Sequence, residues 1–405
     1  MTAFVGVDWA EAHHDVCVKN ESGEILVKRR IPDGIEGVRQ FHELIETFVE
    51  EPSDAWVSIE TDRGLFVGAL VAAGYRVYAV NPFSASRYRD RHSSSGAKSD
   101  PGDAEVLADL VRTDSHHHRQ VAGDTDLAEA VKILARAHQS MIWTKGRQTN
   151  TLRSTLREFY PAALVAFGDN LDAPAALEIL TVAPTPTLGR QLSRSKIAAA
   201  LRRAGRQRRI DESTGAIQDA LRAEELEAPM LIAGAFGSSV AATAKVLIEL
   251  NRQIAELEHE MDAHFEQHPD SKIVLSLPGL GTVLGARVLG EFGDDPERYD
   301  NAKSRKNYAG TSPITRASGT KRVVLARYAR NRRIADATYL WAFAALRKSP
   351  GARALYDRHR KAGDSHHQAL RTLANRLVGI LHGCLVNQAL YDEGVAWGEP
   401  KTEAA

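Results

Sequence analysis

Residues 4–8 read FVGVD, a short apolar run that ends in the acid Asp8. A run of this length and composition predicts a buried strand. Two further strands are predicted over 15–19 and 24–31, and the sequence NESG at 20–23 is typical of the turn between them. The chain therefore starts with three strands connected as hairpins.

Helices and strands alternate after these hairpins. The predicted elements are a helix over 35–49, a strand over 55–60, a helix over 65–73, a strand over 75–80 and a helix over 101–111. Three strands in hairpins followed by this alternation is the element order of an RNase H-like α/β domain. Periodicity alone also allows other mixed sheets.

The charges of the chain cancel between segments. The 405 residues hold 52 Lys+Arg and 52 Asp+Glu, so the formal net charge is +0. Residues 1–60 contain 13 acids and five bases, whereas 179–210 contain eight bases and 301–335 contain ten, with no acid in either segment. The zero balance excludes a uniformly basic DNA-packaging protein, but the two basic segments suit a polyanionic partner.

Cysteine usage and hydropathy indicate the compartment. Cys17 and Cys384 each lack a second cysteine nearby, which argues against a disulfide framework or structural zinc and fits a reducing cytosol. The N-terminus meets acids too early for a signal peptide, and no stretch reaches the ~18 apolar residues of a membrane span. We expect a cytoplasmic protein with no membrane partner.

The pattern beyond residue 120 is mainly helical. Long helical patterns over 127–159 and 246–265 could pair as an antiparallel coiled coil, and prolines interrupt the pattern between them. We therefore predict four regions. They are an α/β domain over 1–120, a coiled-coil region over 121–268 with a basic helical insertion at about 160–225, a mainly helical C-terminal domain over 269–395, and a tail over 396–405.

Four carboxylates stand at the ends of predicted elements. Asp8 and Glu60 end the first and fourth strands, and Asp100 and Asp103 are spaced to share one helical face. In an RNase H-like sheet these strands are neighbours, so the four carboxylates would converge. Converging carboxylates need a counter-charge, which hard divalent cations such as Mg²⁺ or Mn²⁺ supply, and two such ions can serve phosphodiester chemistry.

A structural explanation of these acids also holds. Asp100-Pro101-Gly102-Asp103 is what a plain helix start looks like, with Asp100 as the N-cap and Asp103 favourable near the positive end of the helix. Four other acids lie close enough in sequence to replace members of the set: Glu11, Asp15, Asp62 and Asp90.

Two segments of the C-terminal region suit phosphates. Residues 277–281 read LPGLG, and Gly279 and Gly281 resemble the turn of a helix-hairpin-helix, whose backbone amides approach a DNA phosphate; an ordinary helix-helix turn with a glycine C-cap fits equally well. Residues 308–322 place Ser318 among basic side chains. Ser318 is either an activated nucleophile or a hydrogen-bond donor in a phosphate-binding loop. The basic residues expected to contact nucleic acid are Arg316, Lys321, Arg322, Arg330, Arg332 and Arg333.

The order and spacing of these motifs resemble the DEDD-type insertion-sequence transposases of the IS-one-ten family. The resemblance rests on Asp8, Glu60, residues 98–104 (KSDPGDA), residues 278–281 (PGLG) and the run 309–319 that contains Ser318, and it covers most of the chain except 160–225. It implies a RuvC-like N-terminal domain. It also implies catalytic, metal-binding roles for Asp8, Glu60, Asp100 and Asp103, and a catalytic serine at Ser318 that links covalently to a DNA phosphate.

The resemblance further implies a homo-oligomer, a dimer or tetramer, in which domains of different protomers complete one site. Some members use a structured, element-encoded guide RNA that pairs with donor and target DNA. The chain departs from the usual pattern at Thr311-Ser312, which leaves Ser312 as a rival hydroxyl. The predicted function is a metal-dependent transposase acting on double-stranded DNA. The alternatives are a RuvC-like structure-selective endonuclease that acts by hydrolysis, and a binding protein with a degenerate catalytic fold.

Overall fold

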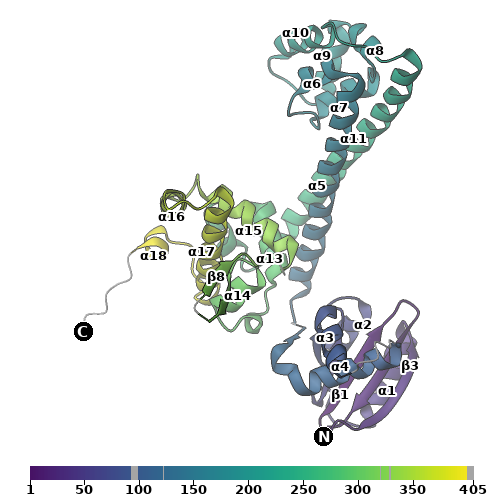
Figure 1. Cartoon of the computed structure of the whole chain (residues 1–405), viewed down its shortest axis with the longest axis vertical. Helices are drawn as coiled ribbons and strands as arrows, with labels where there is room; N and C mark the ends of the chain where they lie inside the picture. The colour runs from purple at the N-terminus through teal and green to yellow at the C-terminus, as the bar shows by residue number, and fades with distance from the viewer. Residues whose placement is uncertain (93–98, 122, 320, 328–329, 399–405) are drawn as a thin grey trace. The chain divides into compact units, whose positions relative to one another are not determined.

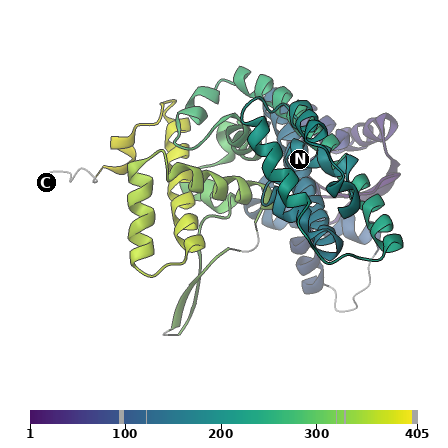
Figure 2. The same ribbon diagram turned by 90° about the horizontal axis from the view of Figure 1, so that it is seen from above.

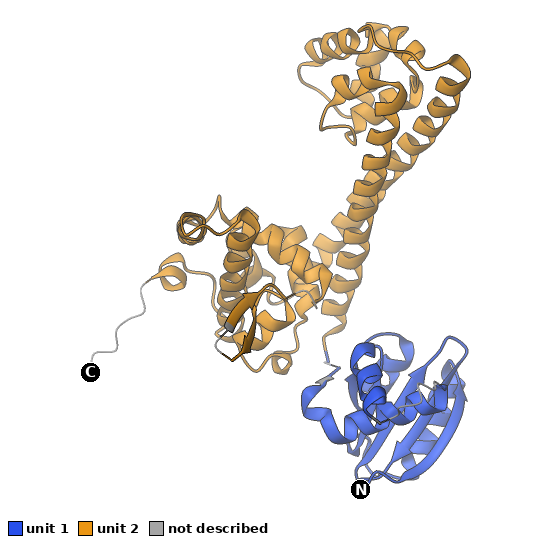
Figure 3. Ribbon diagram, viewed as in Figure 1, with its two compact units in different colours: residues 1–123 blue, residues 124–405 orange. Residues whose placement is uncertain are grey.

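A computed structural model describes residues 1–92, 99–121, 123–319, 321–327 and 330–398. The chain divides into two compact units, residues 1–123 and 124–405, which are described separately (Figure 3). The first unit is built on a mixed sheet and the second is mainly helical (Figure 1). The predicted fold class, a mixed α/β part followed by a mainly helical part, is confirmed at this level. Lys98 and residues 399–405, which the sequence analysis names, lie outside the described residues.

The sheet of the first unit has the strand order β3-β2-β1-β4-β5-β6. Its strands are β1 (Ala3–Trp9), β2 (His13–Lys19), β3 (Ile25–Pro32), β4 (Ala55–Ile59), β5 (Arg76–Ala79) and β6 (Arg119–Gln120). The pairs β1/β2 and β2/β3 are antiparallel, whereas β1/β4 and β4/β5 are parallel. The five predicted strands are confirmed. The edge strand β6 was not predicted, because two residues carry no periodic signal.

Helices cover both faces of this sheet. They are α1 (Ile35–Glu46), α2 (Leu65–Ala72), α3 (Pro82–His92) and α4 (Asp100–Asp114). On one face, Val5 and Val7 of β1 share a core with Phe41 of α1 and Phe66 of α2. Side chains alternate along a strand, so Phe4, Gly6 and Asp8 point to the other face, where α4 lies (Figure 1).

Small residues let α4 approach the sheet closely. A Cβ atom at Gly6 would clash with the carbonyl oxygen of Ala104 and the amide of Ala108. Gly6 lies opposite Cys17 and Ser58 in the neighbouring strands, and the Ser58 hydroxyl donates a hydrogen bond to a carbonyl of α4 at 2.6 Å. Three small residues in one row across the sheet, Gly6, Cys17 and Ser58, therefore allow α4 to lie close to it.

A buried lysine ties α4 to the second strand. Lys19 is only 4% exposed, and its ammonium group lies 2.5 Å from Asp109 and 3.2 Å from Glu105. The two carboxylates raise the pKa of Lys19 against the opposing effect of burial, which is the largest single influence. The ion pair therefore anchors α4 over the strand on which Asp15 lies.

Two long helices form the axis of the second unit. The helix α5 (Asp126–Phe159) and the helix α11 (Met230–Gln267) lie side by side in both views (Figures 1 and 2). The start of α5 and the end of α11 share one core, which includes Val131 and Phe265. The end of α5 and the start of α11 share another, which includes Leu156 and Val240. The two helices are thus antiparallel and connect the two cores of the unit.

Five short helices lie between α5 and α11 in the chain. They are α6 (Pro161–Phe167), α7 (Pro174–Val182), α8 (Pro186–Arg190), α9 (Arg194–Arg203) and α10 (Ile210–Leu221). Proline occupies the first turn of α6, α7 and α8, where a missing amide hydrogen costs nothing. The prolines that interrupt the long helical pattern therefore start new helices.

The helix α11 is long enough and apolar enough, by length and composition, to cross a membrane. Its first 15 residues, 230–244, contain no charged residue, whereas the sequence predicted no stretch of membrane-spanning length. Among the described residues it is the one candidate, and a single helix of this kind is weak evidence. No membrane protein is indicated.

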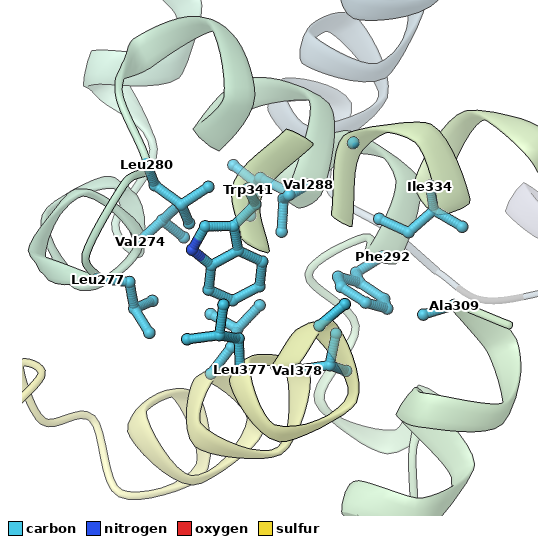
Figure 4. Packing of buried hydrophobic residues seen from close by; sticks show 14 of the residues in the cluster. Val274, Leu277, Leu280, Val288, Phe292, Ala309, Ile334, Trp341, Leu377 and Val378 are labelled. Carbon is cyan, nitrogen blue, oxygen red and sulfur yellow. The ribbon is translucent and has the colours of Figure 1, made fainter. Parts of the chain in front are cut away.

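The C-terminal part of the second unit surrounds a buried tryptophan. The elements here are α12 (Ser271–Ser276), α13 (Thr282–Phe292), α14 (Ala302–Tyr308), β7 (Ile314–Ser318), β8 (Lys321–Leu325), α15 (Arg332–Ala345), α16 (Pro350–Lys361), α17 (His366–Val386) and α18 (Glu393–Trp397). Figure 4 shows Trp341 among Leu277, Leu280 and Leu377, and its indole N–H donates to the carbonyl of Pro278 at 3.0 Å. The hairpin of β7 and β8 was not predicted.

Candidate active site

Three charged residues form a row across the first three strands. Asp8 lies opposite Asp15 in the antiparallel register of β1 and β2, and Asp15 lies opposite Arg30 of β3. Arg30 binds Asp15 through two hydrogen bonds, of 3.2 and 2.8 Å. All three side chains lie on the face that α4 covers. Glu60 directly follows β4, which pairs in parallel with β1, so it lies at the same edge as Asp8.

The start of α4 supplies the other two predicted carboxylates. Asp100 is the first residue of α4, and Ser99 is the N-cap of this helix. The prediction that Asp100 is the N-cap is therefore wrong. Asp103 is buried, at 6% exposure, and lies 2.6 Å from the guanidinium of Arg89 on α3. Asp100 is exposed and lies 3.7 Å from Arg30. Asp103 thus lies beside an arginine of helix α3, and Asp100 lies near an arginine of strand β3.

The electrostatics of Asp8 show that the acids lie near one another. Burial, as the largest cause, and the charges of Asp103, Asp100, Glu60 and Asp15, in that order of effect, together raise the pKa of the Asp8 carboxyl to about 6. Each of these four carboxylates is therefore close enough to disfavour the ionised form of Asp8. The structure brings together the four predicted acids and adds Asp15, which sequence reasoning held as a substitute.

The donor set of this site suits a hard divalent cation. The ligand atoms of His13, Asp15 and Asp100 lie within 4.8 Å of one another. Among the described residues, Asp8, Glu60 and Asp103 do not join so tight a group. Carboxylate oxygens are the preferred ligands of Mg²⁺ and Mn²⁺, and the accumulated negative charge at Asp8 needs a counter-charge. The residues present fit such an ion, and they do not distinguish one metal from another.

Two arginines of the site were missed by sequence reasoning. Arg30 gave a misleading signal, because the pairing of Lys19 with Ile25 beside the turn would set Asp15 opposite Arg29, and only a bulge at Val18/Lys19 brings Arg30 opposite Asp15. Arg89 gave no such signal, since its contact with Asp103 depends on how α3 packs against α4. The other tight group of possible ligands, Asp114, His116 and His117, lies beyond the acidic site at the end of α4.

Ser318 is the last residue of β7 and lies at the tip of the β7–β8 hairpin, in the second unit. It is exposed and lies opposite Lys321 in the strand register. Arg316 is two residues before it and shares its face, whereas Arg322 lies opposite Ala317 and points to the other face. The side chain of Lys321 lies outside those that the structure describes. Ser312, the rival hydroxyl, is half-buried before the hairpin.

The remaining predicted nucleic-acid contacts differ in their surroundings. Arg330 and Arg332 are exposed. Arg333 instead turns into the protein, where it donates to the carbonyl of Arg136 and the hydroxyl of Ser140, each at 3.0 Å. It thereby joins α15 to α5.

The two glycines of the 277–281 turn also differ. Gly279 has φ 85°, and a Cβ atom there would lie 2.5 Å from the amide of Ala345, so packing against α15 explains this glycine. Gly281 is the N-cap of α13, and a Cβ atom there would meet open space. The backbone at Gly281 is the part of the turn that a phosphate could approach.

Comparison with known proteins identifies the chain. Residues 5–161 match a DEDD family described as transposase, and residues 271–357 match the transposase IS116/IS110/IS902 family. The mini-circle protein assigned as the transposase for IS117 in Streptomyces coelicolor is 44% identical over 100% of this chain and 99% of its own length. A 42 kDa protein of insertion element IS900 from Mycobacterium paratuberculosis is 28% identical, with 96% of each chain covered.

An acidic site on a mixed sheet, together with these matches, defines a DNA-acting enzyme of the transposase class. The chain belongs to the IS116/IS110/IS902 transposase family. The resemblance predicted from the motifs is thereby confirmed. The two family matches leave residues 162–270 between them and residues 358–405 after them.

Proposed function

We propose that this chain moves an insertion sequence by metal-dependent cleavage and exchange of DNA strands. Asp8, Glu60, Asp100 and Asp103 hold divalent cations, Mg²⁺ or Mn²⁺, and Ser318 is the nucleophile. The observation that carries the proposal is the raised pKa of Asp8, because it reports a half-buried carboxylate among four others with too little positive charge nearby. A bound cation would neutralise the site and polarise a phosphodiester.

Each protein group has a separate task in this proposal. Arg30 holds Asp15 beside Asp8, and Arg89 orients the buried carboxylate of Asp103. The Ser318 oxygen bonds to a phosphorus atom of DNA, one strand oxygen leaves with a proton, and the hydroxyl gives up its own proton. Attack by a strand-end hydroxyl on the phosphoserine then restores Ser318 and joins the strands. Exposure at the hairpin tip makes Ser318 accessible to DNA.

Further features rest on the family resemblance alone. We propose a homo-oligomer, a dimer or tetramer, and an element-encoded guide RNA as a second nucleic-acid partner. The four predicted regions, 1–120, 121–268, 269–395 and 396–405, serve in this proposal as catalytic domain, coiled-coil region, serine-bearing domain and tail. The basic insertion at 160–225 has no assigned role.

The decisive experiment traps the covalent intermediate. Element-end DNA is incubated with protein and Mg²⁺, and adducts are resolved on a denaturing gel. Wild-type protein gives a protein–DNA adduct, Ser318→Ala gives neither adduct nor strand exchange, and Ser312→Ala behaves as wild type. If Ser318→Ala still cuts DNA without an adduct, the chain is instead a hydrolytic endonuclease, a function that the acidic site of the first unit suffices to support.

A further inference from the structure

Two cavities lie on either side of the turn between α14 and β7. The first has a volume of about 430 Å³ and the second of about 380 Å³. Gly310 and Thr311 of the turn and Arg371 of α17 line both cavities. The two cavities therefore adjoin at a shared wall that includes Arg371, and together they make up the site considered below.

Arginines line this site, and one of them, Arg327, donates to the side-chain oxygen of Asn307 at 3.5 Å. Arg330 and Arg332 line the first cavity, and Arg327 lines the second. Within the described residues, no hydrogen bond or ion pair engages Arg330, Arg332 or Arg371, although Arg371 is half-buried. Burying a cation without a partner is costly, so this environment is suited to an anionic ligand.

The acids of the site are already engaged elsewhere. Asp336 in the first cavity accepts a hydrogen bond from Gln139 at 2.9 Å. Asp364 in the second lies 2.7 Å from a ring nitrogen of His359. Each cavity thus has one acid with a protein partner of its own and at least two arginines, and the charge available to a ligand is positive.

The turn itself positions one of these arginines. Gly310 has φ 69°, and a Cβ atom there would lie 2.5 Å from the Cβ atom of Arg330. Only glycine allows Arg330 to pack over the turn in this way. The side chain of Arg330 is thereby held at the wall of the first cavity.

The second cavity is continuous with the hairpin that carries Ser318. Val324 and Leu325 of β8 line it, and both are exposed apolar side chains, at 60% and 38%. Apolar surface beside the guanidinium groups of Arg327 and Arg371 suits a ligand with alternating anionic and apolar parts. A nucleic-acid strand has this character, since phosphates alternate with sugars along it.

We propose that the two cavities bind successive phosphates of one nucleic-acid strand, with Arg371 as the central contact and Arg330 and Arg327 on its two sides. The proposal rests on the proposed function, because it places this backbone site at the foot of the hairpin that bears the nucleophile. Arginine suits the task through its planar, permanently charged donor group. Arg371 is a contact that the linear basic segment 301–335 did not reveal, because it lies outside that segment.

The test measures binding without divalent metal, so that it does not depend on strand exchange. The full chain is titrated into fluorescent element-end duplex DNA, and in parallel into an RNA of the adjoining non-coding segment, at several salt concentrations. For Arg371→Ala we expect about tenfold weaker binding and a salt slope reduced by about one. Arg330→Ala, an exposed change that spares folding, should act in the same direction. The RNA arm shows which strand supplies the phosphates.

A matched control separates this site from general charge loss. Arg353 on α16 lies outside both cavities and pairs with Asp357 at 2.8 Å. Arg353→Ala should leave both affinities and both salt slopes as in wild type. Unchanged slopes for Arg371→Ala and Arg330→Ala on both probes would overturn the proposal. Strand exchange is measured with Ser318→Ala in a separate assay with Mg²⁺, so failure of the catalytic proposal is seen separately.

Discussion

The acidic site of the first unit and the basic site of the second are built in opposite ways. In the first, acids outnumber the arginines Arg30 and Arg89, which are both paired. In the second, the arginines Arg330 and Arg371 outnumber the acids and have no partner among the described residues. The residues of the first site are held in position by helix α4, which packs tightly on the sheet. The residues of the second site surround the turn at Gly310 and the base of the β7–β8 hairpin. In the functions proposed above, the first site takes a cation and the second an anion, and phosphodiester chemistry can use both.

The largest expected effect comes from removing one carboxylate of the acidic site. Asp8→Asn should lower the rate of strand cleavage by about 10²–10³-fold, because the cation loses a charged ligand where charge develops. Binding of DNA should not weaken, since phosphate contacts belong to the other unit. Cleavage assays and anisotropy titrations on the same preparation measure both. Unchanged cleavage in Asp8→Asn would show that the acidic site does not catalyse it, as expected for a degenerate catalytic fold.

The next largest effect is expected from a substitution that breaks the ion pair between Lys19 and the acids of α4. Lys19→Met leaves Asp109 and Glu105 without their buried partner, and we expect a loss of about 3 kcal/mol in the free energy of unfolding, measured with urea. Lys28 is the matched control, because it also binds Glu105 but is 38% exposed. Lys28→Met should cost less than about 1 kcal/mol. Equal losses in the two variants would show that burial of Lys19 does not matter.

A smaller effect tests the close packing of α4. Gly6→Ala places a methyl group against the backbone of Ala104, so we expect a loss of about 1–3 kcal/mol together with reduced cleavage. Gly68, inside α2, has open space around its missing side chain. Gly68→Ala should therefore stabilise the protein by up to about 1 kcal/mol, through helix propensity. DNA affinity should stay constant in both variants if the two sites are built independently.

The smallest effect concerns the charge of Asp8. Its pKa is raised to about 6 from 3.8, so the folded state binds the proton more tightly than the unfolded chain. This group therefore favours folding at low pH and loses that contribution as pH rises from 3.8 through 6. At pH 7 without metal, the free energy of unfolding of Asp8→Asn should exceed that of the wild type by about 1 kcal/mol, a value reduced to allow for the partial exposure of Asp8. The melting temperature should rise by about 4 °C.

Repeating the melting experiment with divalent metal tests whether the cation binds at Asp8. Adding Mg²⁺ should raise the melting temperature of the wild type more than that of Asp8→Asn, because the cation relieves the repulsion among the carboxylates. Cleavage by the wild type should also fall as pH drops below about 6, where Asp8 becomes protonated. An identical Mg²⁺ response in the two proteins would place the cation away from Asp8.

Local sequence patterns were sufficient for most of the first unit. The strands around Asp8, Asp15 and Glu60 have continuous apolar runs and turn signals, and the spacing of Asp100 and Asp103 follows helical geometry. The β7–β8 hairpin was missed because its strands are short and largely exposed, so no apolar face marks them. The sequence of residues 308–322 therefore predicted only a loop with hydroxyl and basic side chains.

The sequence by itself determined which acids stand at strand and helix ends and which family the motifs resemble, since these depend on residues close in the chain. Only the tertiary structure decided that Arg89 meets Asp103, that Arg333 turns inward and that Arg371 joins a basic site beside the turn at Gly310. Such contacts depend on how separate helices pack, and packing depends on shape across long sequence distances.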